Sequence, residues 1–289
     1  MKRLAIVLAV LAAPAFGQVT LHHVHGLAYS ADGKRLLIPS HHGLAVYESG
    51  KWSKAPGAEH DYMGFVATAK NFYSSGHPAA RSGLRDPFGL IRSRDGGRTW
   101  DKLGLEGETD FHLLAAGWNT NAIYVWNPEP SSRMKSTGLH FTLNEGFTWE
   151  RAAASGLAGK LQALAVHPDD RNTVAVATSQ GLYLSRNAGE RFERIAANGQ
   201  GLAVSFDLDG LHIWYGAFGS RATLSKISLQ ETVPRSVALP ALANDAVAYI
   251  AQNPAQRREY ALATFERSVY LSKDGGKTWS QIAAYGTAK

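Results

Sequence analysis

The sequence has 289 residues, of which 45% are hydrophobic, and it contains no cysteine. The lack of cysteine excludes disulfides, thiolate metal sites, a cysteine nucleophile and a lipid-modified cysteine anchor. The formal charge of +6 comes from scattered Lys and Arg residues, so nucleic acid is not an expected partner.

Residues 1–17 have the pattern of a secretory signal peptide. Lys2 and Arg3 precede an apolar run from Leu4 to Ala13, and small residues follow up to Gly17. The run is shorter than the roughly 20 residues that a membrane-spanning helix needs, and no later run approaches that length. We therefore expect export to the periplasm or the extracellular space. The remaining residues, 18–289, are expected to form one domain without a transmembrane segment.

Four short segments after the leader have the lengths and turn residues of β-strands. HGLAYS (25–30), RLLIPS (35–40), GLAVYE (43–48) and KWSKA (51–55) are separated by polar turns. They predict one four-stranded antiparallel unit. The preceding segment QVTLHHV (18–24) is a candidate outermost strand of the last unit, which would hold the histidines of HHVHG (22–26) where the chain closes on itself.

A turn motif then recurs along the chain. SRDGGRTW (93–100) returns as TLNEGFTW (142–149), SRNAGERF (185–192) and SKDGGKTW (272–279). The marker Asp or Asn stands at positions 95, 144, 187 and 274, and the last interval is about twice the others. A copy without the turn is expected near LSKISLQ (224–230), and AVYESGKW (45–52) is a shortened first copy. Six repeats of four strands predict an all-β fold, a six-bladed β-propeller.

The motif has a structural explanation. Its glycines allow positive φ, the Asp or Asn accepts hydrogen bonds from turn N–H groups, and the Trp packs between blades. The structural residues of the four copies are Asp95, Gly97, Trp100, Asn144, Gly146, Trp149, Asn187, Gly189, Asp274, Gly276 and Trp279. These turns join third and fourth strands.

SxDGGxTW resembles the Asp-box, or BNR, repeat. That repeat is shared by sialidases, sortilin-type domains, photosystem-assembly propellers and exported bacterial propellers often labelled glycosyl hydrolase. The resemblance implies the propeller fold and says little about function. Sialidases of this fold use three arginines around the substrate carboxylate, and the six predicted innermost strands contain no arginine. Sialidase activity is therefore not expected.

Histidines gather in the first three repeats. Aligning the innermost strands puts His25, Met63 and His112 in one column, with His23, Asp61 and Asp110 two residues earlier, and side chains at i and i+2 share a face. Aligning the second strands matches His41 with His77. The resulting candidate metal ligands are His23, His25, His41, His42, His60, Met63, His77 and His112.

These ligand types indicate a metal site at one mouth of the central channel. Imidazole suits copper and zinc, and a thioether favours copper, so copper is the first expectation and zinc the alternative. Asp61 and Asp110 are candidates for orienting the imidazoles. No organic cofactor is predicted. Taken singly, each histidine is more often a structural residue than a ligand.

Two other functions remain open, and with them whether the protein is an enzyme. Asp61 and Asp110 are candidate catalytic residues of a non-sialidase glycoside hydrolase, acting as acid and base. Alternatively the protein is a binding or assembly scaffold. The loops His77–Gly89 and Asn127–Gly138 would then carry recognition of a small ligand or an exported protein partner.

Overall fold

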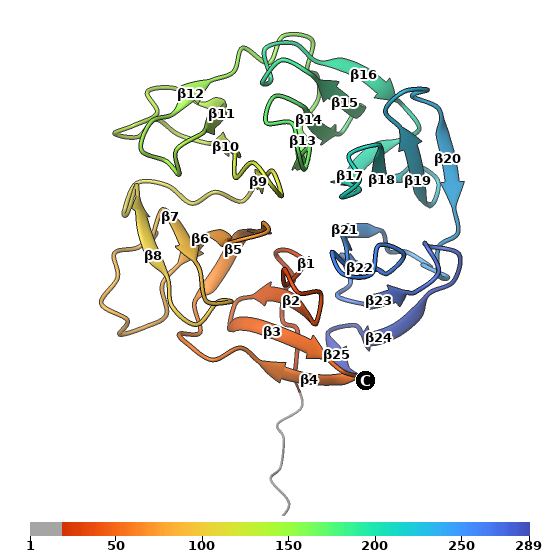
Figure 1. Ribbon diagram of the computed structural model, residues 1–289, viewed down its shortest axis with the longest axis horizontal. Coiled ribbons are helices and arrows are strands. Elements are labelled where there is room, and N and C mark those ends of the chain that lie inside the picture. The colour runs from red at the N-terminus through yellow and green to blue at the C-terminus, as the bar shows by residue number, and fades with distance from the viewer. Residues whose placement is uncertain (1–18) are drawn as a thin grey trace, which may run out of the picture.

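The computed structural model describes residues 19–289, so the expected signal peptide lies outside the described residues. The described chain is all-β and forms six sheets arranged as the blades of a propeller, as predicted (Figure 1). No helix within these residues has the length and apolar character needed to cross a membrane.

The strands of each blade follow one another in the chain. Blade one holds β1 (Ala28–Tyr29), β2 (Arg35–Ser40), β3 (Gly43–Glu48) and β4 (Lys51–Lys54); blade two holds β5 (Asp61–Ala67), β6 (Phe72–His77), β7 (Leu90–Ser93) and β8 (Asp101–Gly104). Blade three holds β9 (Leu114–Ala116), β10 (Ile123–Asn127), β11 (Gly138–Thr142) and β12 (Glu150–Arg151); blade four holds β13 (Leu161–Val166), β14 (Val174–Thr178), β15 (Gly181–Ser185) and β16 (Glu193–Ala196). Blade five holds β17 (Gln200–Phe206), β18 (His212–Phe218), β19 (Ala222–Ser228) and β20 (Pro234–Val237); blade six holds β21 (Val247–Gln252), β22 (Tyr260–Thr264), β23 (Val269–Ser272), β24 (Ser280–Ala284) and β25 (Thr287–Ala288).

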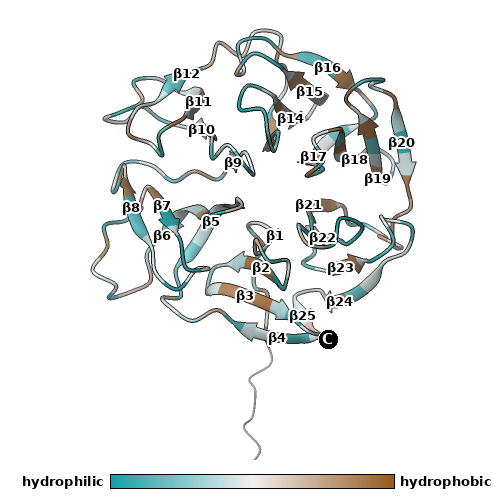
Figure 2. Cartoon of the chain, in the orientation of Figure 1, coloured by the Kyte–Doolittle hydropathy of each residue, from teal (hydrophilic) through white to brown (hydrophobic). Residues whose placement is uncertain are grey.

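The position of a strand within its blade explains its composition. The first strand of each blade, from β1 to β21, lies nearest the centre of the ring (Figure 1). Second and third strands are covered on both faces, and all five residues of β14 (VAVAT) and of β15 (GLYLS) are buried. Fourth strands such as β4 and β12 are mostly exposed and hydrophilic (Figure 2). The buried middle strands therefore supply the core, and burial of each large apolar side chain contributes about 1.5–3 kcal/mol.

The core lies between adjacent blades. One cluster joins Leu37 and Leu44 of blade one to Tyr62 and Phe65 of blade two, and Trp100 of the first strict turn motif packs against it. Trp279 packs in the same way against the cluster between blades five and six. Each blade is thus stabilised mainly by its neighbours, which makes closure of the ring important.

The ring closes where the two described ends of the chain meet. The N–H of Leu21 donates to the carbonyl of Gly286 at 2.7 Å, and Thr20 forms an antiparallel bridge with Thr287. The segment before HHVHG therefore lies at the outer edge of blade six, as predicted. It pairs with a fifth strand of that blade, β25, which the sequence did not indicate.

The turn motif forms a compact hydrogen-bonded loop. Oδ1 of Asp95 accepts the backbone N–H groups of Arg98 and Thr99, while Oδ2 accepts the Thr99 hydroxyl. Gly97 has a φ of 91°, a conformation that favours glycine. Asn144 keeps the backbone contact to Thr148 in blade three. These turns join third and fourth strands, so they lie at the end of the blades opposite to the connections between second and third strands.

Candidate functional site

The predicted site residues lie on one face of the ring, which we call the histidine face. In an antiparallel blade, the connections between blades and those between second and third strands open at the same end. His23 and His25 precede β1, His41 and His42 connect β2 to β3, Asp61 begins β5 and His77 ends β6. Asp110 and His112 precede β9. The column alignment therefore predicted their common location.

His25 is held close to blades one and two by its neighbours in the chain. Its backbone N–H donates to the carbonyl of Pro39 at 3.1 Å. The next residue is Gly26, where an added Cβ would lie 3.0 Å from Cγ of Pro39 and 3.2 Å from Cβ of Phe65. A larger residue here would require Pro39 or Phe65 to shift by a few tenths of an ångström. The glycine of HHVHG thus favours close packing of this segment against blades one and two.

A connection between blades one and two brings His41 and Asp61 together. The N–H of Gly43, just after the β2–β3 turn, donates to the carbonyl of His60 at 3.0 Å. The next residue, Asp61, then lies beside the turn, and its Oδ2 is 2.6 Å from Nδ1 of His41. This hydrogen bond orients the His41 ring and leaves its Nε2 available.

Three histidines converge at this point. His23, His25 and His41 each offer a ligand atom, and these atoms all lie within 4.8 Å of one another. The ring centroids of His23 and His41 are 4.4 Å apart and those of His25 and His41 are 4.7 Å apart. We call this group the histidine triad. Two segments of blade one, 22–25 and 40–42, build it, and blade two contributes Asp61.

The triad contains unsatisfied buried atoms. Nε2 of His25 and Oδ1 of Asp61 are buried, and neither has a hydrogen-bond partner among residues 19–289. The two atoms are 3.8 Å apart, too far for a hydrogen bond. Burial lowers the pKa of His25 to about 4, and the nearby His41 and His23 act in the same direction while Asp61 opposes them. The His25 ring is therefore neutral at neutral pH.

The other candidates form a separate group. Oδ2 of Asp110 lies 2.7 Å from Nε2 of His112 and 3.3 Å from Nε2 of His77, and Nδ1 of His77 lies 2.7 Å from Asp86. The hydrogen bond with Asp110 raises the pKa of His112. Although burial acts against it, the hydrogen bond with Asp86 and the charge of Asp110 raise the pKa of His77. In this second cluster the pKa values of His77 and His112 are raised, whereas in the triad the pKa of His25 is lowered.

Three predicted ligands lie outside both groups: His42 is exposed in the β2–β3 turn, whereas His60 and Met63 are buried. His60 is buried, packs against Tyr62 and Phe88, and accepts the N–H of Ala79 through its Nδ1 at 2.9 Å. Met63 is buried in the β-bulge between Tyr62 and Phe65. The channel cavity is lined there by the residues from Gly64 to Ala67. Both buried positions have the surroundings of structural residues.

The predicted recognition loops differ from each other. In the loop Asn127–Gly138, Met134 is buried in the cluster with Tyr73 and Phe111, and Arg133 donates to the carbonyl of Gly146 at 2.5 Å. This loop is folded against the rest of the molecule. Arg81 and Arg85 of the loop His77–Gly89 are exposed. Both loops keep exposed residues, which in Asn127–Gly138 include Pro128, Glu129 and Pro130.

The central channel below the histidines is a cavity of about 260 Å³. All six innermost strands line it. Its apolar residues include Leu164, Val204 and Ile250, while His25 and His112 contribute imidazoles from the two histidine groups. A ligand in the channel would therefore meet imidazole nitrogens at the histidine face, and both apolar and polar side chains, such as Ser205 and Gln252, line the rest of the cavity.

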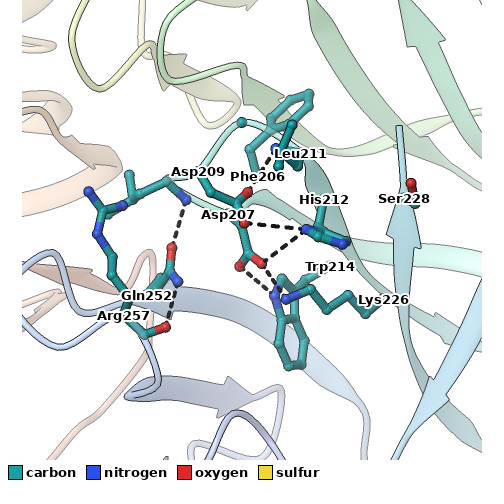
Figure 3. Close-up of polar contacts among 12 residues, drawn as sticks. Phe206, Asp207, Asp209, Leu211, His212, Trp214, Lys226, Ser228, Gln252 and Arg257 are labelled. Carbon is teal, nitrogen blue, oxygen red and sulfur yellow. Dashed lines mark hydrogen bonds and ion pairs between the residues drawn. The ribbon is translucent and has the colours of Figure 1, made fainter. Parts of the chain in front are cut away.

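Sequence reasoning missed two features. His22 was not selected, yet its ring lies against that of His42, with centroids 5.1 Å apart. In blade five the side chain of Asp207, only 1% exposed, is surrounded by Trp214, Lys226 and His212 (Figure 3). The His-rich stretch HHVHG contains His22 and could have suggested it. No local motif marks the Asp207 cluster.

The Asp207 cluster has the character of a structural ion pair. Lys226 Nζ lies 2.5 Å from Oδ2 of Asp207, and Oδ1 accepts the Trp214 indole N–H at 2.7 Å and the Tyr260 hydroxyl at 2.9 Å. Asp209 and His212 complete a group that resembles a metal site in spacing. Because the carboxylate is already neutralised and saturated with donors, it is a poor ligand for a cation.

Comparison with known proteins agrees with this fold. A family model described as the BNR/Asp-box repeat matches residues 270–281, which contain the last strict turn motif. No curated protein matches the sequence. The chain is a six-bladed β-propeller that carries a BNR/Asp-box repeat at residues 270–281, in agreement with the resemblance that the sequence motifs indicated.

Several solved structures share the architecture. The GH74 xyloglucanase from Xanthomonas campestris is 19% identical with a TM-score of 0.56, over 93% of this chain and 46% of that one. The GH74 enzyme of Niastella koreensis is 16% identical with a TM-score of 0.61, over 92% and 46%. The extracellular domain of a putative one-component system from B. thetaiotaomicron is 14% identical with a TM-score of 0.56, over 93% and 34%. The chain thus spans less than half the length of these proteins, and the likeness is one of fold.

Proposed function

We propose that this propeller is an exported metal-binding protein that holds one copper ion, or zinc as the alternative, in the histidine triad at the channel mouth. The observation that carries the proposal is the convergence of His23, His25 and His41 within 4.8 Å, with a buried and unpartnered Nε2 on His25. A buried nitrogen without a partner costs free energy, and a metal bond would offset that cost.

The protonation state of the site supports this proposal. A metal ligand must present a lone pair, and metal binding competes with protons for it. Because the pKa of His25 is lowered to about 4, that ring is neutral at physiological pH. The hydrogen bond between Asp61 and Nδ1 of His41 holds a second ring with its Nε2 turned away from the carboxylate. An imidazole ligand is commonly oriented in this way in metal sites.

The separations also fit a metal after small movements. Ligand atoms around a tetrahedral ion lie about 3.4 Å apart, given bonds of about 2.0–2.1 Å to nitrogen. The triad atoms lie within 4.8 Å, and His23, the exposed member, has room to turn. Three imidazoles leave at least one coordination position for water or a ligand. His25 lines the cavity, so that position would be near the channel.

The choice of copper rests on ligand chemistry. Divalent copper binds nitrogen sites more tightly than zinc does, so three imidazoles favour copper when both metals are present. Met63, which added a thioether to the expected set, is buried in the β-bulge, so this preference does not depend on it. The expected signal peptide and the extracellular origin of the similar B. thetaiotaomicron domain support export.

Elemental mass spectrometry tests the proposal. Untagged chain without residues 1–17 is loaded with copper or zinc and desalted, and His25→Ala/His41→Ala is compared with His112→Asn. His112 lies on the same face but outside the triad, which makes it a matched control. We expect about one metal equivalent in the wild type and the control, and little in the double variant. Absence of metal from wild-type protein, or equal content in all three proteins, would rule out the triad.

A further inference from the structure

Two histidine doublets lie opposite each other at the seam of the ring. His22-His23 precedes β1, and His41-His42 joins β2 to β3. His23 faces His41 with ring centroids 4.4 Å apart, and His22 faces His42 with centroids 5.1 Å apart and planes at 86°. The two pairs are consecutive in the chain. The inner pair borders His25, whose ring centroid lies 4.7 Å from that of His41.

The histidines differ in their exposure to solvent. His22 and His42 are both exposed, His41 is partly covered, and the His25 side chain is only 16% exposed. The backbone holds the outer pair in register. The carbonyl of His22 accepts a hydrogen bond from Nη1 of Arg267 at 3.1 Å, and the N–H of His42 donates to the Ser40 hydroxyl at 3.5 Å. The pairing is thus supported from blade six on one side and from β2 on the other.

We propose that His22 and His42 form a second, weaker metal site through which the ion enters and leaves the triad. This inference rests on the proposed function of the triad. Two imidazoles suffice for a two-coordinate Cu(I) ion, or for a divalent copper ion that keeps several water ligands. When the metal ion moves inward, one of its bonds to His22 or His42 is replaced by a bond to His23 or His41. The oxidation state of the ion does not change, and no proton or electron needs to be supplied.

The chemistry around the two sites explains why the outer one is weaker. Asp61 lies 2.6 Å from His41 and 3.8 Å from His25, so the triad has a carboxylate to stabilise a cation. Within residues 19–289, no carboxylate forms an ion pair with His22 or His42. The outer pair also offers two nitrogen ligands where the triad offers three. An ion is therefore captured at the surface and held more tightly inside.

Titration with copper(II) tests this arrangement on the wild-type chain and on His22→Gln/His42→Gln. The wild type should bind two equivalents with separable affinities, and the variant should keep the tight one and lose the weak one. In stopped-flow mixing, loading of the triad should slow on the order of tenfold, because the outer pair no longer concentrates metal beside it. His112→Gln serves as the control on the same face, and equal melting temperatures of the metal-free proteins show that the exposed substitutions leave the fold intact.

The outcomes separate this inference from the function on which it rests. A single equivalent in the wild type, loaded at the same rate by the variant, overturns the outer site and leaves the triad. Loss of the tight equivalent in His22→Gln/His42→Gln also overturns it, since the outer pair would then belong to the main site. No binding by the wild type overturns both proposals.

Discussion

Nδ1 of His41, in the β2–β3 turn of blade one, lies 2.6 Å from Oδ2 of Asp61, the first residue of blade two. The orientation of one candidate ligand thus depends on the packing of two adjacent blades. Residues that orient ligands commonly change metal affinity by about 10- to 100-fold when they are replaced.

Asp61→Asn tests this relationship. The amide cannot supply the negative charge that supports a cation beside His41, so we expect metal affinity to fall by about 10- to 100-fold. Competition with a chelator of known affinity measures the change. Asp86→Asn, which alters the contact to His77 in the second cluster, should leave affinity within about twofold of wild type. Equal losses in both variants would contradict a specific role for Asp61.

Met63→Leu tests whether the thioether takes part. Met63 is 8% exposed in the bulge of β5, and leucine has nearly the same volume. We expect unchanged metal content, and a stability loss below about 1.5 kcal/mol for this volume-conserving change. Copper affinity is measured under reducing and oxidising conditions. A loss confined to Cu(I) would show that the sulfur reaches the metal and that the structural interpretation of Met63 is wrong.

The turn motif predicts a dependence of stability on acid pH. Although slight burial opposes it, hydrogen bonds from Thr99 and Ser93 lower the pKa of Asp95 to about 2. The pKa of an unperturbed Asp is about 3.9. Asp95 therefore stabilises the folded state above that pH and loses this contribution as the pH falls toward 2. Asp95→Asn should make the free energy of unfolding less dependent on pH in this window. The slope of that free energy against pH should fall by the equivalent of at most about one bound proton.

Urea unfolding at several pH values between 2 and 5 measures this effect. Blade three supplies a natural comparison, because Asn144 occupies the same position as Asp95. The reciprocal change Asn144→Asp should therefore increase the acid sensitivity. Identical pH profiles of the two variants and the wild type would show that these turns do not contribute to acid unfolding.

Lys226 provides a test of the buried cluster in blade five. Lys226→Met leaves the Asp207 carboxylate, which is 1% exposed, without its cationic partner, and breaking such a pair costs about 3–5 kcal/mol. Asp207→Asn combined with Lys226→Met should recover much of this loss, because the amide oxygen still accepts from Trp214 and Tyr260. Chemical denaturation measures both. If the double variant is no more stable than Lys226→Met, the loss comes from side-chain packing and not from the charge.

Much of the architecture could be predicted because a repeat translates position in the chain into position in the ring. The segments RLLIPS and GLAVYE coincide with β2 and β3, and the innermost-strand alignment puts His25, Asp61 and His112 on one face. When one pattern occurs in six copies, a strand that is ambiguous in one copy can be assigned from the others, since each strand takes the same place in its blade.

The finer organisation of the site was beyond the sequence pattern. The bulge between Tyr62 and Phe65 shifts the strand register at Met63, and an alignment of regular strands does not include such a shift. The hydrogen bond between Nδ1 of His60 and the N–H of Ala79 joins residues 19 positions apart, and no sequence pattern indicates it. The division into a triad and a second cluster depends on which carboxylate each ring meets, Asp61 or Asp110, and those contacts cross between blades.

The closure of the ring gives the triad a thermodynamic role. Leu21 pairs with Gly286 at the seam, and the histidines begin at the next residue, so the segment that closes the molecule also carries two of the three triad histidines. An ion shared between His23, His25 and His41 would link this segment to β2. Ring opening and ion release would then be one coupled equilibrium, in which free metal at about 100 times its dissociation constant adds about 2.7 kcal/mol against opening.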